Sequence, residues 1–146
     1  MLLISLVWLH VLGAVLWFGG SATMAAVVGP ALGRSSTATQ TNMAASLAVY
    51  SHRYFAISGG LTIFSGFILA WFTNRFGSPL LGIVILLAIF LAIWGARVTG
   101  PRGDAIATAS DAELPAAIQR IVQSSIVEMV VFVVAFTLMI LVRFGY

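Results

Sequence analysis

Four long apolar runs decide what this chain can fold into. They cover residues 2–28, 54–72, 79–97 and 118–142. A bilayer core of about 30 Å is crossed by roughly 20 helical residues, so each run is close to that length or longer. In hydrocarbon every backbone N–H and C=O must be bonded within the protein, and these runs do not alternate as barrel strands do. The sequence therefore predicts an all-α integral membrane protein, an antiparallel four-helix transmembrane bundle that forms one domain over residues 1–146.

The composition supports a lipid environment and excludes several kinds of chemistry. Only 8% of the residues are charged and 61% are hydrophobic, whereas soluble domains carry roughly 25% charged residues. The basic balance comes from arginines alone and forms no stripe, so we expect no nucleic-acid partner. The chain has no cysteine, which excludes disulfides and thiolate metal sites. It also lacks the phosphate-binding glycine loop, the His-Glu-x-x-His motif and the Gly-x-Ser-x-Gly motif.

Turn signals predict where the spans end. The Gly-Pro pair at 29–30 should close the first span, and the Asn-Arg pair at 74–75 should stop the second. Pro79 suits the first turn of the third helix, and the Gly-Pro pair at 100–101 should break that helix. Asp111 is the expected cap of the fourth helix.

The distribution of arginines between the two sides predicts the orientation of the chain in the membrane. Four spans place both termini on one side, together with the short link at residues 74–78, and that side carries Arg75 and Arg143. The other side carries the remaining five arginines, which are Arg34, Arg53, Arg97, Arg102 and Arg120. The positive-inside rule then predicts a protein of the bacterial inner (plasma) membrane with both termini outside. Residues 39–50 of the first inner link show helical spacing, so they are either an extension of the second helix or a separate interfacial helix.

A histidine in the first span is the first candidate for chemistry. His10, Gly13, Trp17, Gly20 and Met24 are three or four residues apart and share one helix face. An ionisable group inside a membrane span indicates function. One interpretation makes His10 a ligand of haem iron or copper, with Met24 as a soft metal ligand. The other is a histidine hydrogen-bonded inside the bundle.

A glutamate in the fourth span is the second candidate. Counting residues from the span ends places Glu128 within roughly 5 Å of the depth of His10. The hypothesis is that both face one site, where Glu128 orients His10 or accepts a proton. The alternative is that Glu128 bonds Ser or Thr hydroxyls of the second span. His52 should lie roughly 20 Å from His10, as an interfacial anchor or as a second ligand site.

The first span also carries a family pattern. Residues 9–30 read LHVLGAVLWFGGSATMAAVVGP and contain His-x6-Trp-Phe-x-Gly, and His52-Arg53-Tyr54-Phe55 opens the glycine-rich second span. This pattern resembles the copper-resistance D-type membrane domain and, in its first part, the HemJ-type protoporphyrinogen oxidases. The resemblance implies copper handling at the inner membrane, or haem b bound through a histidine, and it carries over to His10 and Trp17. The oxidases also rely on a lysine, and this chain has none.

Together these observations predict a haem- or copper-binding membrane protein with a redox role. The expected cofactor-binding residues are His10, Trp17 and Glu128, and the expected metal ligands are His10 and Met24. The alternatives are an accessory or structural subunit of a larger membrane complex and a small transporter that uses Glu128. We also expect a homo-oligomer or a partner within a membrane complex, because glycine-rich faces favour helix association.

Overall fold

The computed structural model describes residues 1–144, apart from the side chains of residues 44, 45, 48 and 49. Every regular element in this part of the chain is helical. In chain order the elements are α1 (Leu2–Thr23), the π-helical η1 (Met24–Val28), α2 (Gly29–Gly33), α3 (Thr37–Phe72), α4 (Pro79–Trp94), the π-helical η2 (Gly95–Thr99), α5 (Gly100–Thr108) and α6 (Leu114–Arg143).

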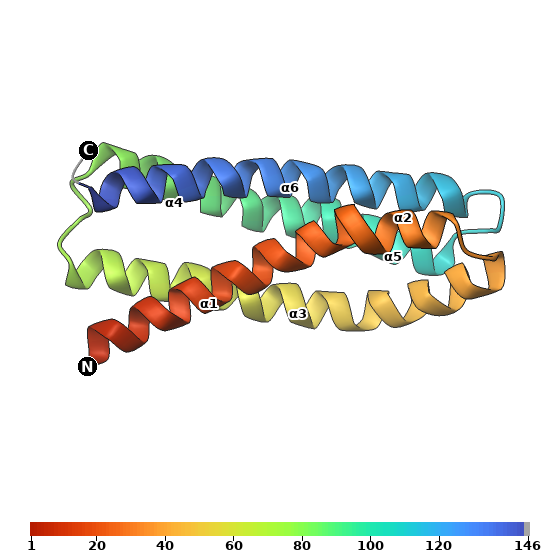
Figure 1. The fold of residues 1–146 in the computed structure, drawn as a ribbon, viewed down its shortest axis with the longest axis horizontal. Coiled ribbons are helices and arrows are strands. Elements are labelled where there is room, and N and C mark those ends of the chain that lie inside the picture. The colour runs from red at the N-terminus through yellow and green to blue at the C-terminus, as the bar shows by residue number, and fades with distance from the viewer. Residues whose placement is uncertain (145–146) are drawn as a thin grey trace.

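Four helical segments lie lengthwise beside one another (Figure 1). Both termini lie at one end, and the loops that join α2 to α3 and α5 to α6 lie at the other. All four segments are long and apolar enough to cross a membrane. These segments are Leu2–Gly33, Tyr50–Phe72, Pro79–Thr108 and Leu114–Arg143.

The helix ends near the termini fall where the sequence predicts them. α3 ends at Phe72, and Asn74 follows with a φ of 51°, a left-handed conformation that asparagine tolerates. Pro79 opens α4 after Ser78, whose hydroxyl accepts a bond from the Leu81 N–H at 3.4 Å. The Arg75 guanidinium donates to the Val142 carbonyl at 3.2 Å, which ties this link to the end of α6.

The two Gly-Pro pairs do not end their helices, so that prediction was wrong. The first segment continues past Pro30 to Gly33, and the third continues past Pro101 to Thr108. A proline inside a helix lacks a donor and crowds the carbonyl four residues earlier. Here each pair follows a five-residue π-helical stretch, in which the Gly29 and Gly100 N–H groups donate to carbonyls five residues back. The wider π turn accommodates the proline and lets the helix go on.

The other two inner helix ends also differ from expectation. Residues 39–50 belong to α3, so they are an extension of the second helix and not a separate one. The cap predicted at Asp111 was wrong, because Ser110 and Glu113 close the start of α6 instead. The Ser110 N–H and hydroxyl donate to the Glu113 carboxylate at 3.2 and 2.6 Å. These bonds close the turn at residues 110–113 that leads into α6, whose N-cap residue is Glu113.

Two apolar clusters hold the segments together. One joins α2, α5 and α6 near the loops through Leu32, Ile106, Leu114, Ala117, Ile118 and Ile121. The other lies farther along, where Trp17 packs edge-on against Phe132 at 5.1 Å between ring centres and Leu91 completes the contact. α1 also packs along α3, and α6 contacts α1 and α4. The space between the two clusters is where the candidate site lies.

A candidate binding cavity around Glu128

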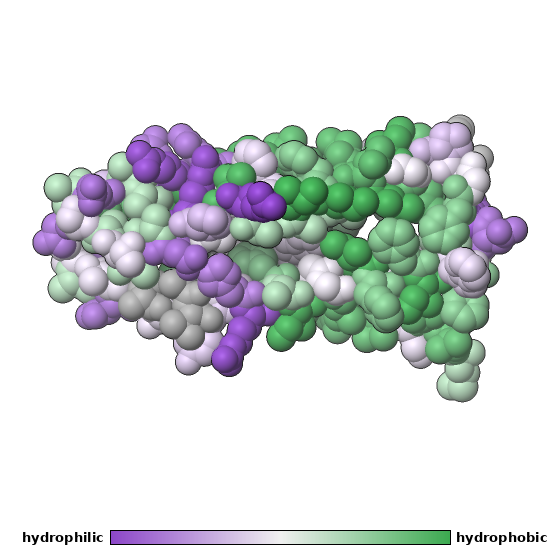
Figure 2. Space-filling model, turned by 180° about the vertical axis from the view of Figure 1, so that it is seen from behind, coloured by the Kyte–Doolittle hydropathy of each residue, from purple (hydrophilic) through white to green (hydrophobic). Residues whose placement is uncertain are grey.

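A cavity of about 820 Å³ lies between the two apolar clusters. Members of both clusters line it, Trp17 and Leu91 on one side and Leu32, Ile106 and Ile121 on the other. All four helical segments contribute walls, including both π-helical stretches. Figure 2 shows the molecule hollowed where its hydrophilic end meets its hydrophobic half. This volume lies within the range of pockets that hold small organic molecules, roughly 300–1,000 Å³.

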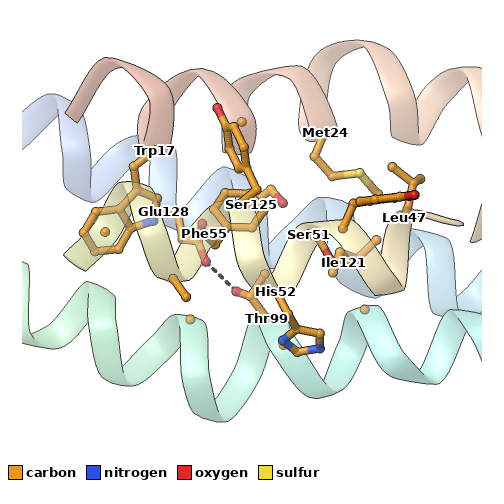
Figure 3. A pocket seen from close by; sticks show the side chains of 18 of the residues that line it. Trp17, Met24, Leu47, Ser51, His52, Phe55, Thr99, Ile121, Ser125 and Glu128 are labelled. Carbon is orange, nitrogen blue, oxygen red and sulfur yellow. Dashed lines mark hydrogen bonds between the residues drawn. The ribbon is translucent and has the colours of Figure 1, made fainter. Parts of the chain in front are cut away.

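Glu128 is the buried acid of this cavity. Its side chain is only 2% exposed, and its two oxygens accept hydrogen bonds from different segments. The Ser21 hydroxyl donates to Oε2 at 2.5 Å. The Thr99 hydroxyl donates to Oε1, also at 2.5 Å (Figure 3). Ser21 lies just before η1 and Thr99 is the last residue of η2. The carboxyl group therefore joins the two segments that carry π-helical stretches.

Within residues 1–144 no basic group forms an ion pair with Glu128. The single ion pair in this range joins His52 to Asp104. A buried carboxylate without a positive partner is costly unless hydrogen bonds or a ligand compensate it. Two hydroxyl bonds leave each oxygen with a further lone pair, since an ionised carboxylate accepts about four hydrogen bonds.

Aromatic rings form the wall next to Glu128. Trp17 packs on the backbone of Gly59, where a Cβ would lie 3.3 Å from its ring. Tyr54 and Phe55 meet edge to face with ring centres 5.3 Å apart, and both line the cavity. The Tyr54 hydroxyl donates to the Leu16 carbonyl at 2.5 Å. These contacts fix three rings from α1 and α3 in the wall.

His52 lines the cavity on the side of the hydrophilic end. Its Nε2 atom lies 2.8 Å from the Asp104 carboxylate, and both side chains are more than half exposed. The pair links α3 to α5. The sequence predicted His52 as an interfacial anchor, but it did not indicate Asp104 as the partner of this side chain.

His10 lies outside this cavity. Its Nδ1 atom is 2.9 Å from the Thr62 carbonyl, and its ring rests on Gly66, where a Cβ would lie 2.9 Å away. Ser21 follows His10 by eleven positions in one continuous helix, a rise of about 16 Å. Because Glu128 bonds Ser21 and Thr99, the hypothesis that Glu128 orients His10 was wrong. The alternative was right about hydroxyl partners, although they come from the first and third segments and not from the second.

The structure also separates His10 and Met24, the two residues that were expected to bind one metal ion. Met24 lines the cavity and follows His10 by 14 positions, which corresponds to about 21 Å along the helix. The two side chains therefore cannot hold one copper ion. No group of three His, Asp or Glu side chains in the described part of the chain is arranged to bind a metal.

The structure thus brings together Trp17, Met24 and Glu128 and separates His10 from them. Sequence reasoning missed Ser21, Thr99 and Tyr54. Ser21 had a signal, because it follows Trp17 by one helical turn on the stripe that contains His10. For Thr99 the sequence offered no signal beyond its position before a Gly-Pro pair.

The comparisons with known proteins identify no relative. The chain matches no protein-family model, no curated protein sequence and no solved structure. The family pattern in residues 9–30 therefore stays a prediction.

Proposed function

We propose that the chain is an antiparallel four-helix bundle that spans the bacterial inner membrane with both termini outside. The termini lie at one end of the molecule, and five arginines belong to the segments that approach the other end. Large apolar side chains cover the surface near the termini (Figure 2). Trp8, Phe64 and Leu86 are 67–70% exposed, and lipid is the environment that favours such exposure.

The helix lengths indicate where this membrane would end. α3 has 36 residues, about 54 Å, which exceeds a hydrocarbon core of about 30 Å. Counting roughly 20 residues from the outer helix ends puts the inner boundary near Ser21, Arg53 and Ser124. The cavity lies across this boundary, and Glu128 lies about 6 Å inside it.

Within this frame we propose that the chain is a small transporter that holds its substrate in the cavity beside Glu128. The observation that carries the proposal is the cavity itself, because its walls are mostly apolar while its lining includes a carboxyl group without a basic partner in the described chain. Apolar walls with a few polar groups are typical of small-molecule sites. Discontinuities in membrane helices commonly mark such sites, and η1 and η2 both line this one.

Two neighbouring serines allow a direct test. Ser124 and Ser125 are both buried, but only Ser125 lines the cavity. Because the natural chain has no cysteine, Ser125→Cys and Ser124→Cys each introduce one reporter thiol. We expect a small water-soluble methanethiosulfonate reagent to modify Cys at 125 much faster than at 124 in inside-out membrane vesicles. Equal rates at the two positions would contradict a ligand-accessible cavity.

A second candidate function rests on His10. Its Nδ1 donates to the Thr62 carbonyl, and no hydrogen bond within the described chain engages Nε2. That arrangement fixes the tautomer that metal-bound histidines use, with Nε2 free to bind. His10 would be a single axial ligand of haem b, a group that supplies one-electron chemistry. A visible spectrum of the purified protein tests this, since a haem band should disappear in His10→Ala, and a colourless protein would refute it.

A further inference from the structure

We propose that the substrate of the Glu128 cavity is an amphipathic organic cation, such as a hydrophobic amine or a quaternary onium ion. This inference rests on the proposed transporter function and adds the chemical class of the substrate. Its basis is the juxtaposition of an unpaired acid with aromatic rings inside an apolar cavity.

The charge of the lining is the first argument. In the described chain, Glu128 is the acidic residue that lines the cavity and His52 is the histidine. No arginine of the described chain lines it. His52 is paired with the Asp104 carboxylate at 2.8 Å. When Glu128 is ionised, the cavity therefore carries negative charge with no arginine in its described lining to balance it, which attracts a cation and repels an anion.

The rings are the second argument. Trp17 and Phe55 line the same cavity as Glu128 (Figure 3), and so does Tyr54. Trp17 comes from the same stretch of α1 as Ser21. The face of an aromatic ring attracts a cation, most strongly where water is excluded. A site that combines such rings with a carboxylate favours bulky cations whose charge is spread over an apolar body.

The size of the cavity argues against a metal ion. A monatomic cation needs several oxygen ligands at short range, and Ca²⁺ takes six to eight. The described lining offers one carboxyl group and a few hydroxyls, and most of the 820 Å³ is bounded by apolar side chains. An organic body fills that space, whereas a small ion would leave it empty.

The contacts of Glu128 suggest how such a cation would act on the protein. Ser21 and Thr99 each donate one hydroxyl bond to the carboxyl group from either side. A cation that approaches the carboxyl group competes with these two bonds. Both donors adjoin π-helical stretches, so substrate binding would loosen the link between the first and third segments at the points where their helices are already irregular.

Tetraphenylphosphonium and tetraphenylborate provide a matched pair of probes, since they share size and shape and differ in the sign of their charge. The readout is protection of the Ser125→Cys thiol from the methanethiosulfonate reagent in detergent-purified protein. We expect tetraphenylphosphonium to protect at a concentration at least about tenfold lower than tetraphenylborate, as a desolvated ion pair with ring contacts requires. Adding Glu128→Gln should remove most of that preference.

The outcomes separate this inference from the function on which it rests. If the thiol at 125 reacts and both probes protect it equally, the cavity exists and the cation inference is wrong. If tetraphenylborate protects better, the charge argument is wrong. If the thiol at 125 reacts no faster than the one at 124, the proposed function itself fails. Comparing the two probes on the chain with Glu128 intact needs no charge variant, so misfolding of Glu128→Gln cannot hide the answer.

Discussion

The contact between α1 and α3 at Gly13 allows a stability prediction with a worked magnitude. A Cβ at this position would lie 2.7 Å from the Thr62 hydroxyl oxygen and 2.9 Å from the Thr62 backbone nitrogen. The hydroxyl cannot turn away freely, because it donates to the Ser58 carbonyl at 2.7 Å. The backbone nitrogen belongs to the interior of α3, so relief requires the two helices to separate by several tenths of an ångström.

We expect Gly13→Ala to destabilise the protein by about 1–2 kcal/mol. Forcing an extra carbon into a packed contact costs about 1–3 kcal/mol, and alanine returns roughly 0.5–1 kcal/mol over glycine in a helix. Gly19 on the same helix is the matched control, because a Cβ there meets nothing within 4 Å. Gly19→Ala should therefore leave stability unchanged or raise it by up to about 1 kcal/mol.

The assay is reversible unfolding of the detergent-solubilised protein in a titration with sodium dodecyl sulfate, followed by far-UV circular dichroism. The predicted order of stability is Gly19→Ala at or above the natural chain, and Gly13→Ala below it. If the two alanine variants unfold at the same point, α1 does not approach α3 at Gly13 as described. The packing argument would then be refuted, whatever the ligand of the cavity.

Two further predictions concern the loops at the hydrophilic end. The buried Gln40 side chain donates to the Leu32 carbonyl of α2 and to the Ser35 carbonyl of the following loop, so Gln40→Ala should cost about 1–3 kcal/mol in the same titration. The matched change Thr41→Ala, at an exposed position, should cost little. The hydroxyl and N–H of Ser110 lower the pKa of the Glu113 carboxyl, so this pair supports the start of α6 at neutral pH and loses that support as the pH falls through the lowered pKa. Ser110→Ala should raise the Glu113 pKa toward its usual value of about 4.3, which a carbon-13 NMR titration measures, and an unchanged pKa would show that the bond is not formed in solution.

Counting residues from the span ends predicted that Glu128 and His10 lie at the same depth, and that prediction failed. The comparison of His10 with Glu128 assumed that the fourth span starts near residue 118 at the inner face of the membrane. α6 instead begins at Leu114, and Glu128 bonds Ser21, which follows His10 by eleven positions in α1. In the proposed membrane frame Glu128 would then lie closer to the inner boundary than the count suggested.

The sequence by itself determined the helical class, the four apolar segments and the helix ends near the termini, because those depend on hydropathy, length and local turn residues. It also identified Glu128 as a site candidate, since an acid inside an apolar run must find compensation, whereas Trp17 was named from the family pattern. Only the tertiary structure decided the partners of Glu128, the continuation of two helices through Gly-Pro pairs and the position of His10 outside the cavity. Those features depend on which faces meet and on where the helix departs from α geometry, and neither the hydropathy pattern nor the residue count contains that information.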